Sequence, residues 1–236
     1  MAEQSPFKWR HFQSEIILFC VRWYLRSPFS YRQLEEMMRE QGLSVDHSTI
    51  YRWVQHDAPE LEKRCRLHLK ATTDSWKVDE TSIKVKKEWA SLYQAVDSQG
   101  NTLDFWFSST RDAKAAKHFF LTTLAASPSS EPRVITVDKN AAYLKAFTEL
   151  KAEGNIPENG ELREVTYLNT LIEKAHRFIK RLTRPGMGFF SFETAWRTLQ
   201  GFEVMNMIRK GQVQGVDKAD VSGQVALVAR RFAVIA

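Results

Sequence analysis

The change of hydrophobic period near residue 74 constrains the fold of this chain most strongly. Before it, apolar residues recur at helical spacing; after it, three segments rich in β-branched and aromatic residues follow one another, as strands do. Short links between them, among them the turn-forming DSQGN, predict an antiparallel meander. The expected strands are 76–85, 88–96 and 102–109, followed by a helix over 112–126, a strand over 133–137, a helix over 140–150, a strand over 162–168 and helices within 167–182 and 191–211.

Three strands, a helix, a strand, a helix, a strand and then helices is the element order of the ribonuclease H-like fold. We therefore expect an α/β fold whose first strand lies at the centre of the sheet, with the fourth strand parallel beside it. Asp79 lies within the first strand and Asp138 ends the fourth, so neighbouring strands would hold the two carboxylates side by side. A later helix packed over that edge could add Glu173. Glu80 should point to the opposite face, because side chains alternate along a strand.

The first 72 residues predict helices, two of which form a helix-turn-helix. One helix has Ser30 as N-cap with Gln33 in the capping-box position, and it stops at Gly42. Asp46 can cap a second short helix, 47–56, which would enter the major groove. A plain helical hairpin is the alternative, and Pro59 is expected to begin a further helix. The residues expected to face outward and contact DNA are Ser48, Thr49, Tyr51, Arg52 and Gln55.

The charge distribution favours a polyanionic partner. The formal net charge is +6, and residues 166–216 hold eight Lys and Arg against three Glu. Nucleic acid is the first candidate and an acidic membrane surface the second. Because no uninterrupted apolar run approaches the length of a transmembrane helix, the membrane hypothesis is set aside. Two cysteines without metal-ligand spacing predict buried thiols in a reducing cytoplasm.

One glutamate, Glu173, lies in an otherwise basic helix. Ile172, Ala175, Ile179 and Leu182 form its apolar stripe. The simplest interpretation of Glu173 is an intrahelical ion pair with the residue four positions on, Arg177. The other interpretation is that Glu173 joins Asp79 and Asp138 in a metal site, with the basic neighbours holding phosphates.

The intervals between the three acids favour the second interpretation. There are 58 residues between Asp79 and Asp138, and 34 between Asp138 and Glu173. With this spacing the chain resembles a DDE transposase of a bacterial insertion sequence, and more closely the insertion sequence six family. The resemblance extends from about residue 7 to the region of Gly211 and rests on the stretches FKWRHF, VDHSTIYRWVQ, VDETSIKV, YQAVDSQGNTLDF, TVDKNAAY, NTLIEKAHRFIKR and GFEVMNMIRKGQ.

The resemblance implies a catalytic core of the retroviral integrase type over 73–212, between a DNA-binding region, 1–72, and a C-terminal tail, 213–236. It implies that Asp79, Asp138 and Glu173 are the catalytic triad. Lys180 matches a basic residue usual two turns after the glutamate, and with Arg177 and Arg181 it would contact DNA. Clustered carboxylates suit two Mg²⁺ ions about 4 Å apart, or Mn²⁺ as a substitute.

The function expected from these features is binding to the terminal inverted repeats of an insertion sequence, followed by strand cleavage and transfer into target DNA. The resemblance implies a homodimer or larger synaptic complex and a replicative route. We expect a cytoplasmic protein that associates with the nucleoid through DNA. A nuclease or junction resolvase on the same fold, and a decayed copy that only binds DNA, are the alternatives.

Overall fold

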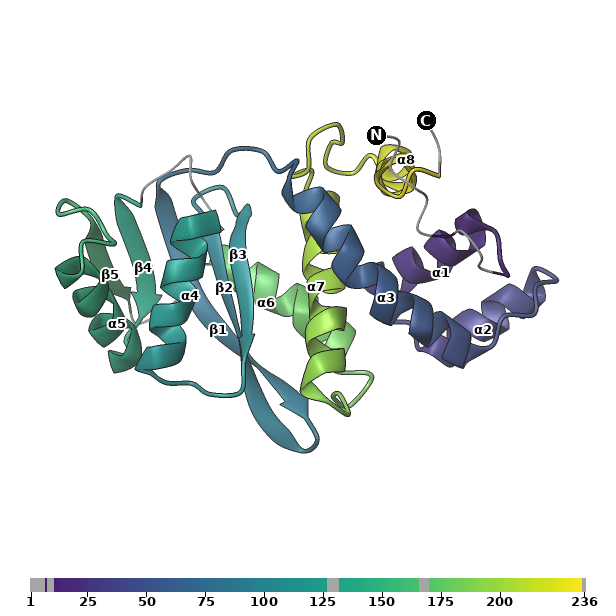
Figure 1. The fold of residues 1–236 in the computed structure, drawn as a ribbon, viewed down its shortest axis with the longest axis horizontal. Coiled ribbons are helices and arrows are strands. Elements are labelled where there is room, and N and C mark those ends of the chain that lie inside the picture. The colour runs from purple at the N-terminus through teal and green to yellow at the C-terminus, as the bar shows by residue number, and fades with distance from the viewer. Residues whose placement is uncertain (1–6, 8–10, 127–131, 166–169, 235–236) are drawn as a thin grey trace. The chain divides into compact units, whose positions relative to one another are not determined.

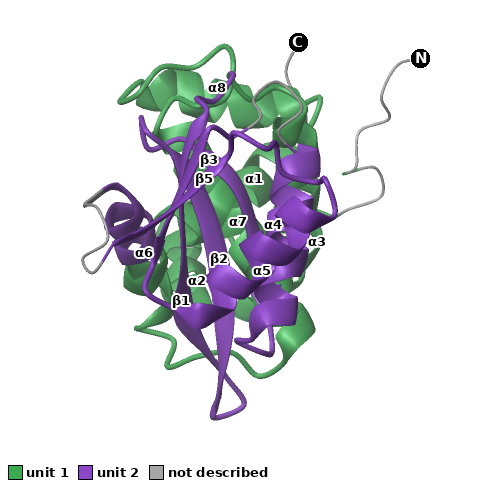
Figure 2. Cartoon of the chain, turned by 90° about the vertical axis from the view of Figure 1, so that its left-hand side faces the viewer, with its two compact units in different colours: residues 1–70, 179–236 green, residues 71–178 purple. Residues whose placement is uncertain are grey.

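The computed structural model describes residues 7, 11–126, 132–165 and 170–234 of the 236-residue chain (Figure 1). The elements follow one another in the order α1 (Ser14–Arg26), α2 (Tyr31–Glu40), α3 (His47–Arg66), β1 (Ser75–Val85), β2 (Glu88–Asp97), β3 (Thr102–Ser108), α4 (Ala113–Ala126), β4 (Val134–Asp138), α5 (Ala141–Ala152), β5 (Glu161–Val165), α6 (Thr170–Thr183), α7 (Phe192–Arg209) and α8 (Val221–Arg231). They divide between two compact units, one of residues 1–70 and 179–236, the other of residues 71–178 (Figure 2). The division falls inside α6, between Phe178 and Ile179.

The unit of residues 71–178 is built on one five-stranded sheet in the order β3-β2-β1-β4-β5. The meander β1-β2-β3 is antiparallel, whereas β4 pairs parallel with β1 and β5 pairs parallel with β4. This is the ribonuclease H-like arrangement that the element order predicts, with β1 central and β4 beside it. The expected α/β fold class is confirmed.

Helices cover both faces of this sheet. Trp76 and Val78 of β1 and Tyr93 of β2 join Phe119 of α4 and Tyr143 of α5 in one buried core. On the other face Val96 of β2 packs with Ile172 and Ala175 of α6, which lies behind the sheet in Figure 1. The apolar stripe predicted for α6 is buried along its length, from Ile172 to Leu182. The first residues expected in this helix, 167–169, lie outside the described part of the chain.

Asp97 fixes the turn between β2 and β3. Its carboxylate is fully buried and accepts hydrogen bonds from the backbone nitrogens of Gln99 and Asn101, at 2.9 and 2.8 Å. The backbone nitrogen of Thr73 donates to its other oxygen. This acid therefore stabilises a turn that holds β2 and β3 in register.

The other unit contains α2 and α3, the two helices that the sequence predicts on either side of a short turn. Ser30 and Gln33 form the capping box of α2, and Gly42 has a φ of 75° just past the end of that helix. Asp46 caps α3 by accepting a hydrogen bond from the backbone of Ser48. The local signals for the start and end of these helices are thus confirmed.

Helix α3 is longer than the sequence predicts. It runs unbroken for 20 residues and includes Pro59, which we expected to begin a separate helix. A proline in a helix interior removes a backbone donor and so costs stability. Ala58 and Leu61, on either side of it, are buried, and this burial offsets the missing hydrogen bond.

Two C-terminal helices pack within the same unit. Helix α7 lies against α3 and α1, so closely that a Cβ on Gly201 would come within 2.6 Å of Leu25 and Ala58. The sequence assigned this helix to the catalytic core, whereas its packing partners are the N-terminal helices. Residues 221–231, for which no element was expected, form α8, with Leu227 and Val228 buried.

Both cysteines are buried and unpaired, as predicted, and burial raises the pKa of Cys20 to about 11 and that of Cys65 to about 12. None of the helices in the described ranges combines the length and the apolar character needed to cross a membrane.

Candidate catalytic site

The pairing of β1 with β4 brings the two predicted aspartates into line. Ser75, Trp76 and Lys77 pair with Val134, Ile135 and Thr136. Continuing this register by two residues aligns Asp79 with Asp138. The chain then turns directly into α5, which Asn140 caps by accepting a hydrogen bond from the backbone of Ala142. Local sequence therefore ends β4 at Asp138 and places its carboxylate at the C-terminal end of the strand.

The surroundings of the two aspartates oppose their ionisation. Burial, reinforced by the charges of Glu80 and Asp138, raises the pKa of Asp79 to about 7. Burial, followed by the charge of Glu80, also raises the pKa of Asp138. Partly buried carboxyl groups close to other acids are costly unless a cation compensates them.

Helix α6 lies over the face of the sheet to which Asp79 points. His176 Nδ1 is 3.6 Å from Asp79 Oδ2, and both side chains are largely buried. Glu173 precedes His176 by three residues, and side chains three apart share a helix face, with about 5–6 Å between their Cβ atoms. Glu173 is exposed on that face. The sequence did not predict a role for His176, because nothing in its spacing distinguishes it from an ordinary helix residue.

The simplest interpretation of Glu173 finds no support in the structure. Within the described residues, neither Glu173 nor Arg177 takes part in an ion pair. The intrahelical pair therefore does not account for Glu173.

A buried bridge holds β1 from the opposite face of the sheet. The side chain of Glu80 is 3% exposed, pairs with Arg111 Nε and accepts a hydrogen bond from the Tyr143 hydroxyl. Glu80 thus points away from Asp79, as strand alternation predicts. The bridge itself was missed, since Arg111 precedes α4 and Tyr143 lies in α5, far from Glu80 in sequence.

The oxygen ligands present fit a divalent cation. Asp138 Oδ1 is buried and has no hydrogen-bond partner among the described residues. An orphaned buried carboxylate oxygen is costly, and a bound cation would satisfy it. Three carboxylates without cysteine ligands favour Mg²⁺ over zinc.

The predicted DNA contacts on α3 are only partly at the surface. Ser48, Tyr51 and Arg52 are exposed and Thr49 is half-buried, with Arg52 donating to its hydroxyl. The outward position expected for Gln55 is wrong. Its side chain is buried and donates to Thr198 Oγ1 of α7 at 2.9 Å, because α3 packs on α7 along this face.

The basic residues of α6 differ in their surroundings. Arg177 and Arg181 are exposed and Lys180 is half-buried. Arg181 donates to the backbone carbonyl of Arg26 at the end of α1, at 3.2 Å. Such a contact satisfies a backbone carbonyl at the C-terminus of α1 and places the positive charge of Arg181 there.

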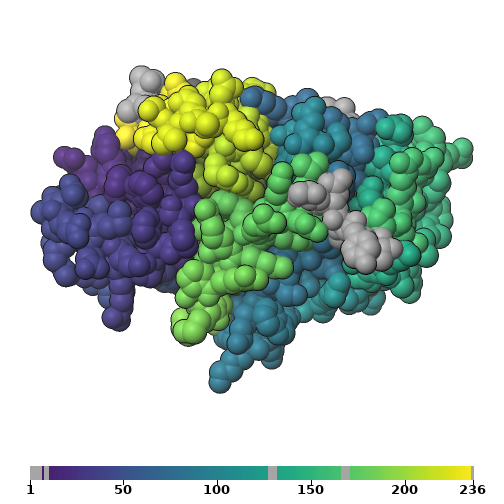
Figure 3. Space-filling view, turned by 180° about the vertical axis from the view of Figure 1, so that it is seen from behind, coloured from purple at the N-terminus to yellow at the C-terminus, as the bar shows by residue number. Residues whose placement is uncertain are grey.

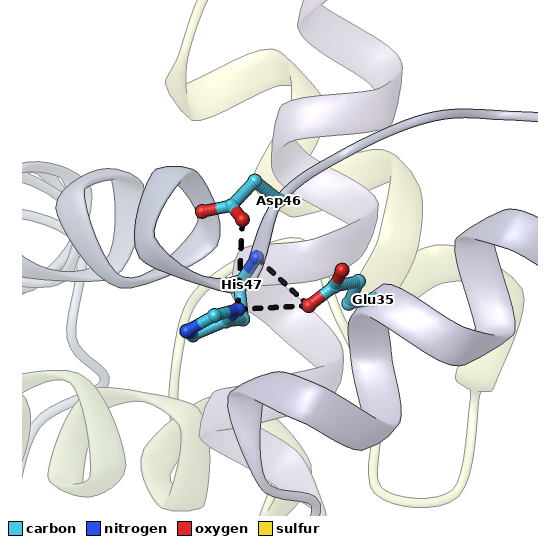
Figure 4. Close-up of side chains that lie close together, drawn as sticks. All are labelled: Glu35, Asp46 and His47. Carbon is cyan, nitrogen blue, oxygen red and sulfur yellow. Dashed lines mark hydrogen bonds and ion pairs between the residues drawn. The ribbon is translucent and has the colours of Figure 1, made fainter.

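One other group could hold a metal ion by geometry alone. Glu35, Asp46 and His47 place ligand atoms within 4.8 Å of one another, and the described residues contain no other such group of three (Figure 4). The contacts of these residues connect α2 to the start of α3. Glu35 accepts from the backbone nitrogen and pairs with the ring of His47, while Asp46 caps the helix. Asp79, Asp138 and Glu173 are not as tightly grouped.

The chain is similar to several known proteins. A family model described as a DDE domain matches residues 73–212. The transposase for insertion sequence-like element IS431mec of Staphylococcus aureus is 37% identical over 205 residues, which are 86% of this chain and 88% of that protein. The same values hold for the transposase for insertion sequence element IS257 in transposon Tn4003. A structure of the HTLV-2 integrase catalytic core domain in complex with magnesium covers 66% of this chain and 93% of its own, with 18% identity and a TM-score of 0.42.

A ribonuclease H-like sheet, carboxylates on the neighbouring strands β1 and β4 and the DDE match define the class, a DNA transposase of the polynucleotidyl transferase type. Within that class the extent of the IS431mec and IS257 matches decides the family. The chain belongs to the insertion sequence six family of DDE transposases.

Proposed function

We propose that this transposase binds the terminal inverted repeats of its insertion sequence and catalyses metal-dependent cleavage and transfer of DNA strands. The observation that carries the proposal is the register between β1 and β4, which, continued by two residues, aligns Asp79 within β1 with Asp138 at the end of β4. The contact of His176 with Asp79 supports Glu173 as the third acid, because Glu173 precedes His176 by about one turn of the same helix.

Asp79, Asp138 and Glu173 would hold two Mg²⁺ ions, with Mn²⁺ as a substitute. When bound, such ions activate an attacking oxygen and stabilise the oxygen that leaves. The carboxylates of Asp79 and Asp138 must lose their protons to bind a cation, so the raised pKa of each couples metal binding to proton release. The bridge of Glu80 to Arg111 and Tyr143 would hold β1, and with it Asp79, in position.

Two sets of residues would hold DNA. Ser48, Thr49, Tyr51 and Arg52 on α3 would contact the terminal repeats, and we omit Gln55 because it is buried. Arg177, Lys180 and Arg181 on α6 would bind phosphates of the DNA backbone. The enzyme would act as a homodimer or larger synaptic complex by a replicative route, as its family membership suggests.

The wild-type product distinguishes this function from its alternatives. Purified protein is incubated with Mg²⁺, a labelled fragment carrying the ends of its insertion sequence and a supercoiled target plasmid. A transposase joins the label to the plasmid, whereas a nuclease or junction resolvase releases label without joining. A decayed copy binds the labelled ends in a mobility-shift assay and leaves them intact. Hydrolysis alone, or binding alone, would overturn the proposal.

A further inference from the structure

The hairpin formed by β1 and β2 extends beyond the rest of its sheet. Strand β2 pairs with β3 only from Ser91 to Val96, and β1 pairs with β4 only from Ser75 to Lys77. Residues 83–90 therefore pair only with each other among the described strands. The projecting end is visible in Figures 1 and 2 and, from behind, at the lower edge of Figure 3.

The two faces of this projection differ sharply. Ile83, Val85 and Ala90 are buried on one face. On the other, Lys84 and Trp89 are direct cross-strand partners and both are exposed. The indole of Trp89 is 67% exposed, more than any other large apolar side chain described in the unit of residues 71–178. An exposed tryptophan beside a lysine forms a surface suited to a flat, negatively charged partner.

The turn of the hairpin places two more lysines at its end. Lys86 and Lys87 connect the strands, with φ values of 49° and 74°. A two-residue turn with two left-handed residues favours Asn-Gly, since side chains disfavour this backbone region. Strained residues gather at functional sites, and here the strained positions carry positive charge.

The charge of the hairpin tip, residues 84–89, is not neutralised locally. Three lysines stand against the single acid Glu88. Within the described residues none of these lysines forms an ion pair. A second copy of the chain would bring the same positive tip, so a symmetric contact between tips would be repulsive, whereas DNA has the opposite charge.

We propose that the hairpin tip is a DNA contact separate from helix α3. Lys84, Lys86 and Lys87 bind backbone phosphates, and the Trp89 indole stacks on a base that is not stacked within a duplex. The proposal rests on the proposed function in that it takes DNA as the partner. It adds a site that recognises unpaired bases, such as those of a single-stranded tail.

Binding of the full-length protein to two labelled probes tests the proposal. One probe is a blunt duplex and the other is the same duplex with a single-stranded 3′ tail, both followed by fluorescence anisotropy. Trp89→Ala should weaken binding to the tailed probe about fivefold to a hundredfold, as expected for loss of one stacked base. It should change binding to the blunt duplex little. Leu144→Ala removes another exposed apolar side chain, from α5, and should alter neither affinity.

The lysines are tested through salt dependence and stability. Lys86→Ala and Lys87→Ala should each lower the salt slope of binding by about one unit, whereas Lys145→Ala, an exposed lysine on α5, should not. The double variant Lys86→Asn with Lys87→Gly should raise the melting temperature by about 2–4 °C, because it relieves the turn, and still weaken DNA binding. Higher stability with lower affinity excludes misfolding as the cause.

Two results overturn the proposal. The first is wild-type affinity of Trp89→Ala for the tailed probe. The second is that variants of the tip lose the oligomer in mass photometry but keep wild-type affinity for DNA, which would make the tip a subunit contact. In either case a wild-type protein that still joins strands leaves the proposed function intact. A wild-type protein that binds neither probe removes the proposed function itself.

Discussion

At the scale of residues, the protonation of Asp79 links the site to the stability of the protein. Its pKa is about 7 in the folded chain, whereas an unperturbed aspartate has a pKa of about 3.9. Between these values the folded state holds a proton that the unfolded state has lost. The contribution of Asp79 to stability is therefore complete below the lower value, falls as pH rises through this window and is constant above about pH 7.

We therefore predict how the unfolding free energy of wild-type protein changes relative to Asp79→Asn in EDTA. From about pH 4 to pH 7 the wild type should lose stability against the variant by up to about 1.4 kcal/mol per pH unit. Above pH 7, Mg²⁺ should restore wild-type stability and leave the variant unchanged. Denaturant titrations at a series of pH values measure both effects. A constant difference across the window would show that Asp79 is not perturbed.

The Glu80 bridge is a second feature at this scale. Tyr143→Phe removes the hydroxyl that donates to the buried carboxylate, and should lower the unfolding free energy by about 1.5–3 kcal/mol, the contribution of a hydrogen bond to a charged group. Tyr51→Phe, at an exposed position on α3, should cost far less. Equal losses in the two variants would mean that the bridge does not stabilise the sheet.

At the scale of elements, the two faces of α3 should respond differently to substitution. Arg52→Ala should weaken binding to the terminal repeats more than to random duplex, by about 1–3 kcal/mol of discrimination, because Arg52 is exposed. Gln55→Ala should instead destabilise the fold, because its side chain is hydrogen-bonded to Thr198. Mobility shifts on both duplexes and thermal melts separate the two effects. Equal weakening on both duplexes by Arg52→Ala would make Arg52 a phosphate contact.

Two residues on one face of α6, Glu173 and Lys180, should likewise respond differently to substitution. Lys180 follows Glu173 by seven residues, nearly two turns and about 10 Å along the axis, whereas Lys174 is rotated by about 100°. Lys180→Ala should reduce the salt slope of DNA binding by about one unit and leave the Mn²⁺ requirement unchanged. Lys174→Ala serves as the control, with a smaller effect on the slope. A raised Mn²⁺ requirement in Lys180→Ala would place this lysine in the metal site instead.

At the scale of the whole molecule, sequence predicted the strand order of the sheet better than the packing of the helices. Element order and strand periodicity predict β1 beside β4, and hence Asp79 beside Asp138, because strand order and register determine which residues of neighbouring strands lie side by side. The packing partners of α7 were not predictable in this way, since the apolar residues of a helix show that it is buried but not which elements bury it. Tertiary packing also explains three other differences from the sequence predictions. Gln55 is buried, Pro59 lies inside α3, and residues 221–231 form α8.

The parts of the site that sequence missed are tertiary contacts. His176 meets Asp79, and Glu80 meets Arg111 and Tyr143, only after the sheet and its helices have assembled. Motif spacing identifies residues that perform a chemical task. It does not identify residues that position them, because their partners can come from any element nearby.

Strand joining by Glu173→Gln tests the central claim most directly. The control is Glu193→Gln, which alters a glutamate in the first turn of α7 as Glu173 lies in the first turn of α6. Both variants are given labelled insertion-sequence ends, target plasmid and Mg²⁺, and their binding to the ends is measured in parallel. We predict that Glu173→Gln binds the ends as wild type does and yields no joined product above background, while Glu193→Gln joins normally. Near-normal joining by Glu173→Gln would contradict the account and return Glu173 to the role of an ordinary helix charge.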